Sequence, residues 1–153
     1  YKAAIASLAN QASNYLMTKH IPRAIGSLHP NIAPYGELFT TKDKVLITFA
    51  IGTNTHFQKL CNFLNLHFLM EDIRFNSTSA RVKNREELFE ILNDAIKMHN
   101  SNALLEAMHK KYVPVAKIKN LEEVFENPIA QSMIREEVID GETTKRVSQI
   151  AFE

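Results

Sequence analysis

Residues 26–36 read Gly26-Ser27-Leu28-His29-Pro30-Asn31-Ile32-Ala33-Pro34-Tyr35-Gly36 and join a helical segment to a strand-rich one. Three of the chain's five prolines lie within or just before this loop, at Pro22, Pro30 and Pro34. Proline fixes its own φ and favours extended geometry in the residue before it, so we expect a stiff loop. Stiff, irregular loops that carry polar side chains are frequent places for ligand contact. The candidate substrate-pocket residues are therefore His29, Asn31 and Tyr35.

Each of the three candidates also has a purely structural interpretation. A histidine in such a loop commonly bonds to the backbone of the loop itself. Asn31 can cap a turn, since asparagine side chains readily bond to nearby backbone groups. Tyr35 can anchor the loop to the core instead of stacking on a ligand. The residue types alone leave both interpretations open.

The segments around the loop have clear periodicities. Residues 3–17 carry apolar side chains at helical spacing and predict one uninterrupted helix. Residues 36–51 are rich in strand formers and predict a hairpin that turns at Thr41–Lys44. Apolar residues occupy both faces of the second strand, so we expect each face to be covered.

The remaining two thirds of the chain alternates helices with short strands. We expect an edge strand or a loop over 112–118, because Pro114 cannot donate to a sheet ladder. Asp140-Gly141 predicts the turn of a hairpin with strands around 133–139 and 145–152. Helices are expected after the capping residues Thr53 and Asn120, from Pro128, and over 80–98 and 103–111. The fold class is α+β: a small, mostly antiparallel sheet packed with several helices and preceded by a long linker helix.

Composition excludes several classes of partner and location. The 153 residues contain 18 Lys and Arg against 17 Asp and Glu, so no basic surplus indicates a nucleic acid or an anionic membrane as a partner. No apolar run approaches the roughly 18 residues of a membrane span. The lone Cys61 allows no intramolecular disulfide and favours a reducing, cytoplasmic location. Because Cys61 falls on an apolar helix stripe, we interpret it as an inert core thiol rather than a nucleophile.

No catalytic or metal-binding motif is evident in the sequence. The four glycines do not form a phosphate-binding loop, and the six histidines form no HExxH pattern. We therefore expect no catalytic residue and no metal site in this chain. Arg81 and Arg85 are four residues apart and can clamp a carboxylate or phosphate. The alternative is that they are solvated or paired with Glu71 and Asp72.

An ordered set of short motifs resembles one enzyme family. The motifs run over nearly the whole chain as Leu8-Ala9-Asn10-Gln11-Ala12, Asn14-Tyr15-Leu16, His29-Pro30-Asn31-Ile32-Ala33-Pro34-Tyr35, Gly52-Thr53-Asn54, Phe57 with Leu60-Cys61, Arg74-Phe75-Asn76, Ala80-Arg81-Val82 with Asn84-Arg85 and Leu88, Val113-Pro114-Val115, and Glu123-Val124-Phe125-Glu126-Asn127-Pro128. In order and spacing they resemble the family III CoA-transferases, the CaiB/BaiF group, which includes formyl-CoA transferase and α-methylacyl-CoA racemase.

The resemblance implies that this chain is one of two domains of a larger enzyme, each with a different role. Members of this family have a large Rossmann-like domain and a small α+β domain, and two subunits interlock. The large domain supplies most contacts to coenzyme A. A catalytic Asp, N-terminal to the segment that matches here, attacks the acyl-CoA thioester. Residues 1–25 would then be a linker helix toward the large domain, and 26–153 the small domain. The loop that carries His29, Asn31 and Tyr35 would lie near the acyl end of the substrate.

Two departures from the family pattern fall in one loop. Tyr112 stands where the family usually has Gly before Val-Pro, and Ala116-Lys117 where it has Gly-Pro. We expect this loop to be placed differently, so the resemblance assigns no role in the acyl pocket to residues 112–118.

The expected function is that of the small domain of an enzyme that moves CoA from an acyl-CoA thioester to a carboxylate. The isolated chain is expected to be inactive and to bind no cofactor alone, with coenzyme A or acyl-CoA as substrate of the full enzyme. Two alternatives stay open: a non-catalytic remnant or interaction module, and part of a racemase-like enzyme. Because the first helix would expose Ile5, Leu8 and Leu16, we expect a homodimer, and the large domain as a partner.

Overall fold

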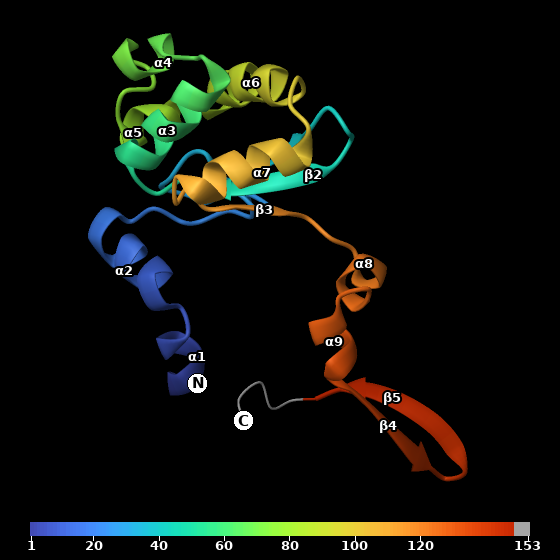
Figure 1. Ribbon diagram of the computed structural model, residues 1–153. Coiled ribbons are helices and arrows are strands. Elements are labelled where there is room, and N and C mark those ends of the chain that lie inside the picture. Colours follow the sequence, from blue (N-terminus) through green and yellow to red (C-terminus); the bar gives the residue numbers. More distant parts are fainter. Residues whose placement is uncertain (149–153) are drawn as a thin grey trace.

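The computed structural model describes residues 1–148, except for the side chain of Asn10. Figure 1 shows a central body of helices and a small sheet, from which the two terminal segments extend as separate arms. In chain order the elements are α1 (Lys2–Ala6), α2 (Ala9–Thr18), β1 (Tyr35–Thr40), β2 (Leu46–Ala50), α3 (Asn54–Leu64), α4 (Phe68–Glu71), α5 (Thr78–Lys83), α6 (Arg85–Ile96), α7 (Ser101–Lys110), β3 (Val115–Lys117), α8 (Leu121–Phe125), α9 (Pro128–Ser132), β4 (Ile134–Ile139) and β5 (Glu142–Val147).

The sheet in the central body has the order β1-β2-β3, and both pairs of neighbouring strands are antiparallel. Phe39 of β1 pairs with Ile47, and Phe49 of β2 pairs with Val115 of the short edge strand. The predicted turn Thr41–Lys44 joins β1 to β2. Of the two possibilities expected around Pro114, the structure shows the edge strand, β3. The α+β prediction, with a small antiparallel sheet among several helices, is therefore confirmed.

The core lies between one face of this sheet and the helices. Helices α3 to α7 gather on that side in Figure 1. The buried side chains are Phe39, Ile47, Phe49, Ile51, Phe57, Leu60, Cys61, Leu64, Leu69, Phe75, Leu88, Leu92, Ile96, Leu104, Met108, Val113 and Val115. Cys61 is fully buried, which confirms its expected place in the core, and burial raises the pKa of its thiol to about 12, so the thiolate is disfavoured.

The opposite face of the sheet is more open than the sequence predicts. Along β2, Ile47 and Phe49 are buried, whereas Leu46, Thr48 and Ala50 are only partly covered. Leu38 of β1 is 41% exposed. Side chains of a strand alternate between the two faces, so one face carries the core and the other is only partly covered in this chain.

The predicted helix over 3–17 is divided into α1 and α2. The break falls at Ser7 and Leu8, and Ala9 has a φ of 45°. The Ser7 hydroxyl donates to the carbonyl of Ala3 at 2.7 Å, in addition to the Ser7 backbone N–H at 3.0 Å, and such back-bonding often bends a helix. No residue of α1 is buried, so packing does not hold the two pieces together as one helix.

The predicted helix over 80–98 is also two helices. Asn84 ends α5 and begins α6, with φ −109° and ψ 32°. Its side-chain amide donates to the carbonyls of Ala80 and Arg74, at 2.9 and 3.1 Å. Arg81 and Arg85 therefore belong to different helices, although they are only four residues apart.

Residues that cap helices or form turns predict the ends of the shorter helices and strands well. Thr53 caps α3 by accepting from the backbone N–H of His56 at 3.1 Å, and Asn120 with Glu123 forms the capping box of α8. Pro128 opens α9. Asp140 and Gly141 form the turn between β4 and β5. Of the predicted last strand 145–152, the part over 149–152 lies outside the described residues.

The β1–β2 turn is joined to the start of α7 by one carboxylate. Asp43 accepts hydrogen bonds from the Ser101 backbone N–H at 2.8 Å, the Ser101 hydroxyl at 2.7 Å and the Thr41 hydroxyl at 2.7 Å. These donors favour the ionised form and hold the pKa of Asp43 well below its usual range. The carboxylate also complements the helix N-terminus.

We expect Asp43→Asn to destabilise the protein at neutral pH and much less in acid. Because the folded-state pKa of Asp43 lies below the unfolded-state value of about 3.9, the contribution of this carboxylate is present above that pH. It is lost as the pH falls through the lower folded-state value. Urea midpoints of both proteins at pH 7 and pH 2 measure the difference, since at pH 3 the folded protein still keeps this carboxylate ionised. Asp94→Asn, on the exposed face of α6, is the control, and an equal loss at both pH values would contradict the prediction.

Candidate functional site

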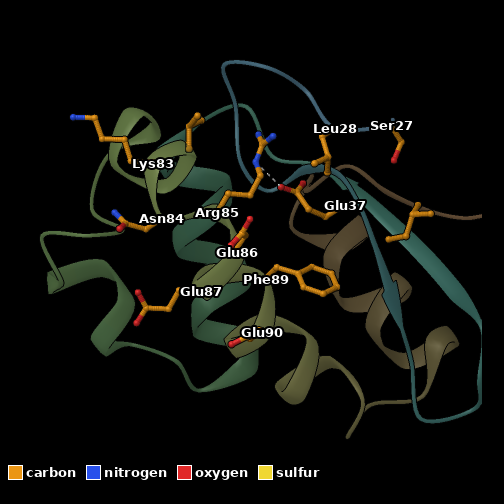
Figure 2. A pocket seen from close by; sticks show the side chains of 12 residues that line it. Ser27, Leu28, Glu37, Lys83, Asn84, Arg85, Glu86, Glu87, Phe89 and Glu90 are labelled. Carbon is orange, nitrogen blue, oxygen red and sulfur yellow. Dashed lines mark ion pairs between the residues drawn. The ribbon is translucent and has the colours of Figure 1, made fainter. Parts of the chain in front are cut away.

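The loop of residues 29–35 is held in place by an arginine and a glutamate from neighbouring elements. Arg85, at the first position of α6, donates through Nη2 to the carbonyl of His29 at 2.6 Å and to the carbonyl of Ile32. Its Nε lies 3.1 Å from Oε1 of Glu37. Glu37 is on β1, and its Oε2 accepts from the backbone N–H of Tyr35. Figure 2 shows the ion pair between Arg85 and Glu37.

A second arginine holds the same loop from inside the core. Arg81 is fully buried, and Nε donates to the carbonyl of Ala33 at 2.8 Å. Nη1 donates to the carbonyl of Phe75 at 3.0 Å, and Nη2 to the side-chain oxygens of Asn54 and Thr78. The guanidinium carbon lies 4.3 Å from the centre of the Phe57 ring, a cation–π contact. Burial lowers the pKa of Arg81.

The two predicted clamp residues thus meet at the loop rather than at an open anion site. Arg81 has no exposed surface, and both guanidiniums donate to loop carbonyls. The alternative pairing with Glu71 and Asp72 is replaced by other partners: Arg85 pairs with Glu37, and Asp72 pairs with Arg74. Binding of an external anion by Arg81 and Arg85 stays a prediction.

The loop itself contains further contacts among the predicted pocket residues. The backbone N–H of His29 donates to the carbonyl of Tyr35 at 2.9 Å, and that of Asn31 donates to Nδ1 of His29 at 3.2 Å. The rings of His29 and Tyr35 lie 5.0 Å apart at an angle of 50°. The backbone-bonding interpretation of His29 is confirmed. Contact of His29, Asn31 or Tyr35 with a ligand stays a prediction.

An open cavity of about 1040 Å³ lies beside the loop, between β1 and α5–α6. Figure 2 shows its lining: Ser27, Leu28, Glu37, Leu38, Val82, Lys83, Asn84, Arg85, Glu86, Glu87, Phe89 and Glu90. Arg85 connects the loop to this cavity. Tyr35 lines a smaller hollow on the open face of the sheet, together with residues of β2 and β3.

Glu37 is the part of the site that the sequence analysis did not single out. It is 5% exposed, in a strand whose neighbouring residues Leu38 and Phe39 are apolar. A carboxylate is rarely buried without a partner, so an acidic residue early in a core strand was an available signal. The spacing of residues along the chain does not reveal that Arg85, 48 positions later, is that partner.

The loop is closed at its far end by a very short approach between two backbones. Gly36 has a φ of 90°, and the Ser27 hydroxyl donates to its carbonyl at 2.7 Å. A Cβ built on Gly36 would lie 2.0 Å from the carbonyl oxygen of Ser27. Only glycine fits this position without displacing the backbone.

The altered loop at 112–118 begins with a helix-ending turn typical of glycine. The Tyr112 N–H donates to the carbonyl of His109, and the Val113 N–H to that of Met108, both at 2.9 Å. This is the Schellman pattern, and its left-handed position is Tyr112, with φ 56°. Tyr112 therefore takes the left-handed geometry that a glycine would adopt at this position.

We expect Tyr112→Gly to stabilise the protein by about 0.5–1 kcal/mol, because the strain of left-handed backbone outweighs the added entropy of the unfolded chain. The Tyr112 side chain is 84% exposed, so little packing is lost. Thermal or urea unfolding measures the change. Tyr112→Ala, which keeps a Cβ, serves as the control and should show no such gain. A lower urea midpoint for the glycine variant would count against the strain.

Among residues 1–148, no group of three or more His, Cys, Asp and Glu side chains is placed to hold a metal ion. No helix within that range is both long enough and apolar enough to cross a membrane.

Comparison with known proteins identifies the class. A sequence model of CoA-transferase family III matches residues 1–152. The chain therefore belongs to the family III CoA-transferases, as the ordered motifs of its sequence indicate.

Individual relatives match only over part of their length. The succinate–glutarate CoA-transferase of Agrobacterium fabrum is 37% identical over 83% of this chain and 31% of its own. The human succinyl-CoA:glutarate CoA-transferase is 32% identical over 81% of this chain and 28% of its own. The crystal structure of a CaiB/BaiF family protein from Brucella suis superposes with a TM-score of 0.73 and 34% identity, over 96% of this chain and 38% of that one. The chain thus spans about a third of the length of these relatives.

Proposed function

We propose that this chain is the small domain of a CoA-transferase that moves CoA from an acyl-CoA thioester to a carboxylate. The observation that carries the proposal is the family match across residues 1–152, combined with coverage of only about a third of each relative. The catalytic Asp and most contacts to CoA would belong to a large Rossmann-like domain. The chain alone is then inactive, and residues 1–25 lead toward that domain while 26–153 form the small one. The single thiol Cys61 supports a cytoplasmic location.

Short dicarboxylates are the substrates that we propose. Succinate and glutarate are named for the Agrobacterium relative, and succinyl-CoA and glutarate for the human one. In this proposal the loop with His29, Asn31 and Tyr35 forms the wall of the site at the acyl end of the substrate. The stiffness of the loop suits this role, because a wall that positions a substrate must itself keep one geometry.

The test measures CoA transfer from succinyl-CoA to glutarate. The chain alone should give no turnover. The chain mixed with the remaining two thirds of the Agrobacterium enzyme, or substituted into that enzyme in place of the matching segment, should produce glutaryl-CoA. The segment from the enzyme itself is the positive control. Absence of a complex and of turnover in both formats would contradict the proposal.

The two alternatives predict different results when the same proteins are also assayed with a 2-methylacyl-CoA in deuterated water. A racemase-like enzyme would exchange the α-proton of a 2-methylacyl-CoA for deuterium without forming glutaryl-CoA. A remnant or interaction module would form a complex and catalyse neither reaction.

We also propose that the chain self-associates as a homodimer. The arms expose apolar side chains, among them Ile5, Leu8 and Leu16 at 51%, 54% and 65%. Exposed apolar side chains of this kind favour association. Sedimentation at tens of micromolar should give a dimer, and Ile5→Lys with Leu16→Lys should weaken it. A monomer at high micromolar concentration would contradict this proposal.

A further inference from the structure

We propose that Glu37 and Arg85 are positioning residues that lock the loop of residues 29–35 in one shape and thereby present His29 as a hydrogen-bond donor. The locked loop would contact the acyl group of the substrate, and this part of the inference rests on the proposed function. The locking itself is a property of this chain.

The contacts form a closed circuit around the loop. Tyr35 donates its N–H to Glu37, Glu37 pairs with Arg85, and Arg85 donates to the carbonyl of His29. The backbone N–H of His29 then donates to the carbonyl of Tyr35, which closes the circuit. Arg85 also donates to the carbonyl of Ile32, so one guanidinium holds the start and the middle of the loop.

The circuit is shielded from water, although it borders the open cavity. The side chains of Glu37 and Arg85 are 4% and 15% exposed. An ion pair that is largely desolvated and also bonds to backbone groups is far more restrictive than an exposed pair. Arg81 differs, because it contacts the loop only at the carbonyl of Ala33 and otherwise bonds to Asn54, Phe75 and Thr78. Arg81 therefore supports the core, whereas the contacts of Glu37 and Arg85 converge on the loop.

The locked loop sets the tautomer of His29. The Asn31 N–H donates to Nδ1, so the neutral ring carries its proton on Nε2. The Tyr35 ring lies against the imidazole at 5.0 Å. Within residues 1–148, no hydrogen bond of the imidazole uses Nε2. His29 thus presents an N–H donor suited to an oxygen acceptor, such as a carboxylate or a thioester carbonyl.

The locking is tested on the chain alone with Arg85→Met and with the double variant Glu37→Gln/Arg85→Met. The double variant leaves no buried charge unpaired, so it keeps the test valid if the single variant fails to fold. Arg74→Met, an arginine in an exposed ion-pair network, is the matched control.

The readouts are amide hydrogen exchange in residues 28–36 and 88–96, and the tautomer of His29 determined by ¹⁵N NMR. The expected result is at least tenfold faster exchange in 28–36, exchange in 88–96 within about twofold of the parent, and a mixed tautomer at His29. Unchanged exchange in the loop and an unchanged tautomer would overturn the inference, as would equal acceleration in both segments. The control should match the parent.

A second measurement separates this inference from the proposed function. In the substituted Agrobacterium enzyme, the double variant should lower kcat at least tenfold and change the KM for succinyl-CoA by less than threefold. If the parent shows no turnover, the proposed function fails, while the exchange and tautomer measurements still decide the locking. If the parent turns over and the loosened variant keeps its kcat, the positioning role is wrong.

Discussion

Arg81→Met is expected to lower the free energy of unfolding by about 4 kcal/mol or more. The change removes four hydrogen bonds made by a fully buried cation. It leaves the carbonyls of Ala33 and Phe75 buried without their donor, and each such group costs about 1–3 kcal/mol. Since small domains have a total stability of about 5–15 kcal/mol, this change should remove a large fraction of the free energy of unfolding.

Urea unfolding followed by far-UV circular dichroism measures this loss. Arg81→Lys keeps the charge but not the planar fork, so it should recover only part of the stability. Arg74→Met, which removes an arginine from an exposed network, should shift the midpoint little. A midpoint for Arg81→Met close to that of Arg74→Met would show that the buried arginine is not needed.

Gly36→Ala is expected to be the most damaging of the possible glycine-to-alanine changes at the described positions. The added Cβ would lie 2.0 Å from the carbonyl oxygen of Ser27, and the backbone at φ 90° already disfavours a side chain. The Cβ is fixed rigidly to the backbone of residue 36 and its neighbour is the backbone of Ser27, so the collision can be removed only by moving the loop. We expect a loss of at least about 3 kcal/mol, more than the roughly 1–2 kcal/mol of left-handed strain alone.

Two other glycines separate strain from collision. Gly26 has a φ of 66° but nothing within 4 Å of a Cβ, so Gly26→Ala should show only the cost of left-handed backbone. Gly52 has neither the positive φ nor a near neighbour, and Gly52→Ala should be close to neutral. The urea midpoint should be highest for Gly52→Ala, lower for Gly26→Ala and lowest for Gly36→Ala. Equal losses at Gly26 and Gly36 would exclude the collision as the cause.

Sequence patterns predict the local elements of this fold where a residue acts on its own neighbours. The cap at Thr53, the capping box at Asn120, Pro128 at a helix start and the Asp140-Gly141 turn are all confirmed, because each depends on bonds within a few residues. Continuous apolar periodicity over 80–98 did not reveal the break at Asn84, because the amide of that residue bonds to the carbonyl of Arg74, in a different segment.

The candidate site shows the same limit more clearly. The loop and both arginines are evident from residue type, but the sequence does not reveal that Arg81 is enclosed by Ala33, Phe75 and Asn54. Glu37 was missed because its partners, Tyr35 and Arg85, are identified only by the tertiary fold. The type of a residue shows which hydrogen bonds it can donate or accept. Its actual partner depends on the tertiary fold, which brings together residues dozens of positions apart in the sequence.

The separation between the loop and its two arginines has a consequence for synthesis of the chain. The carbonyls of Ala33 and His29 receive their donors from residues 48 and 56 positions later. At about 5–20 residues per second, the ribosome needs roughly 3–11 s to add the 56 residues that reach Arg85. During that time the newly made loop has its prolines but not its cationic partners. A nascent chain released before residue 85 would therefore contain every loop residue and still lack the loop's final shape.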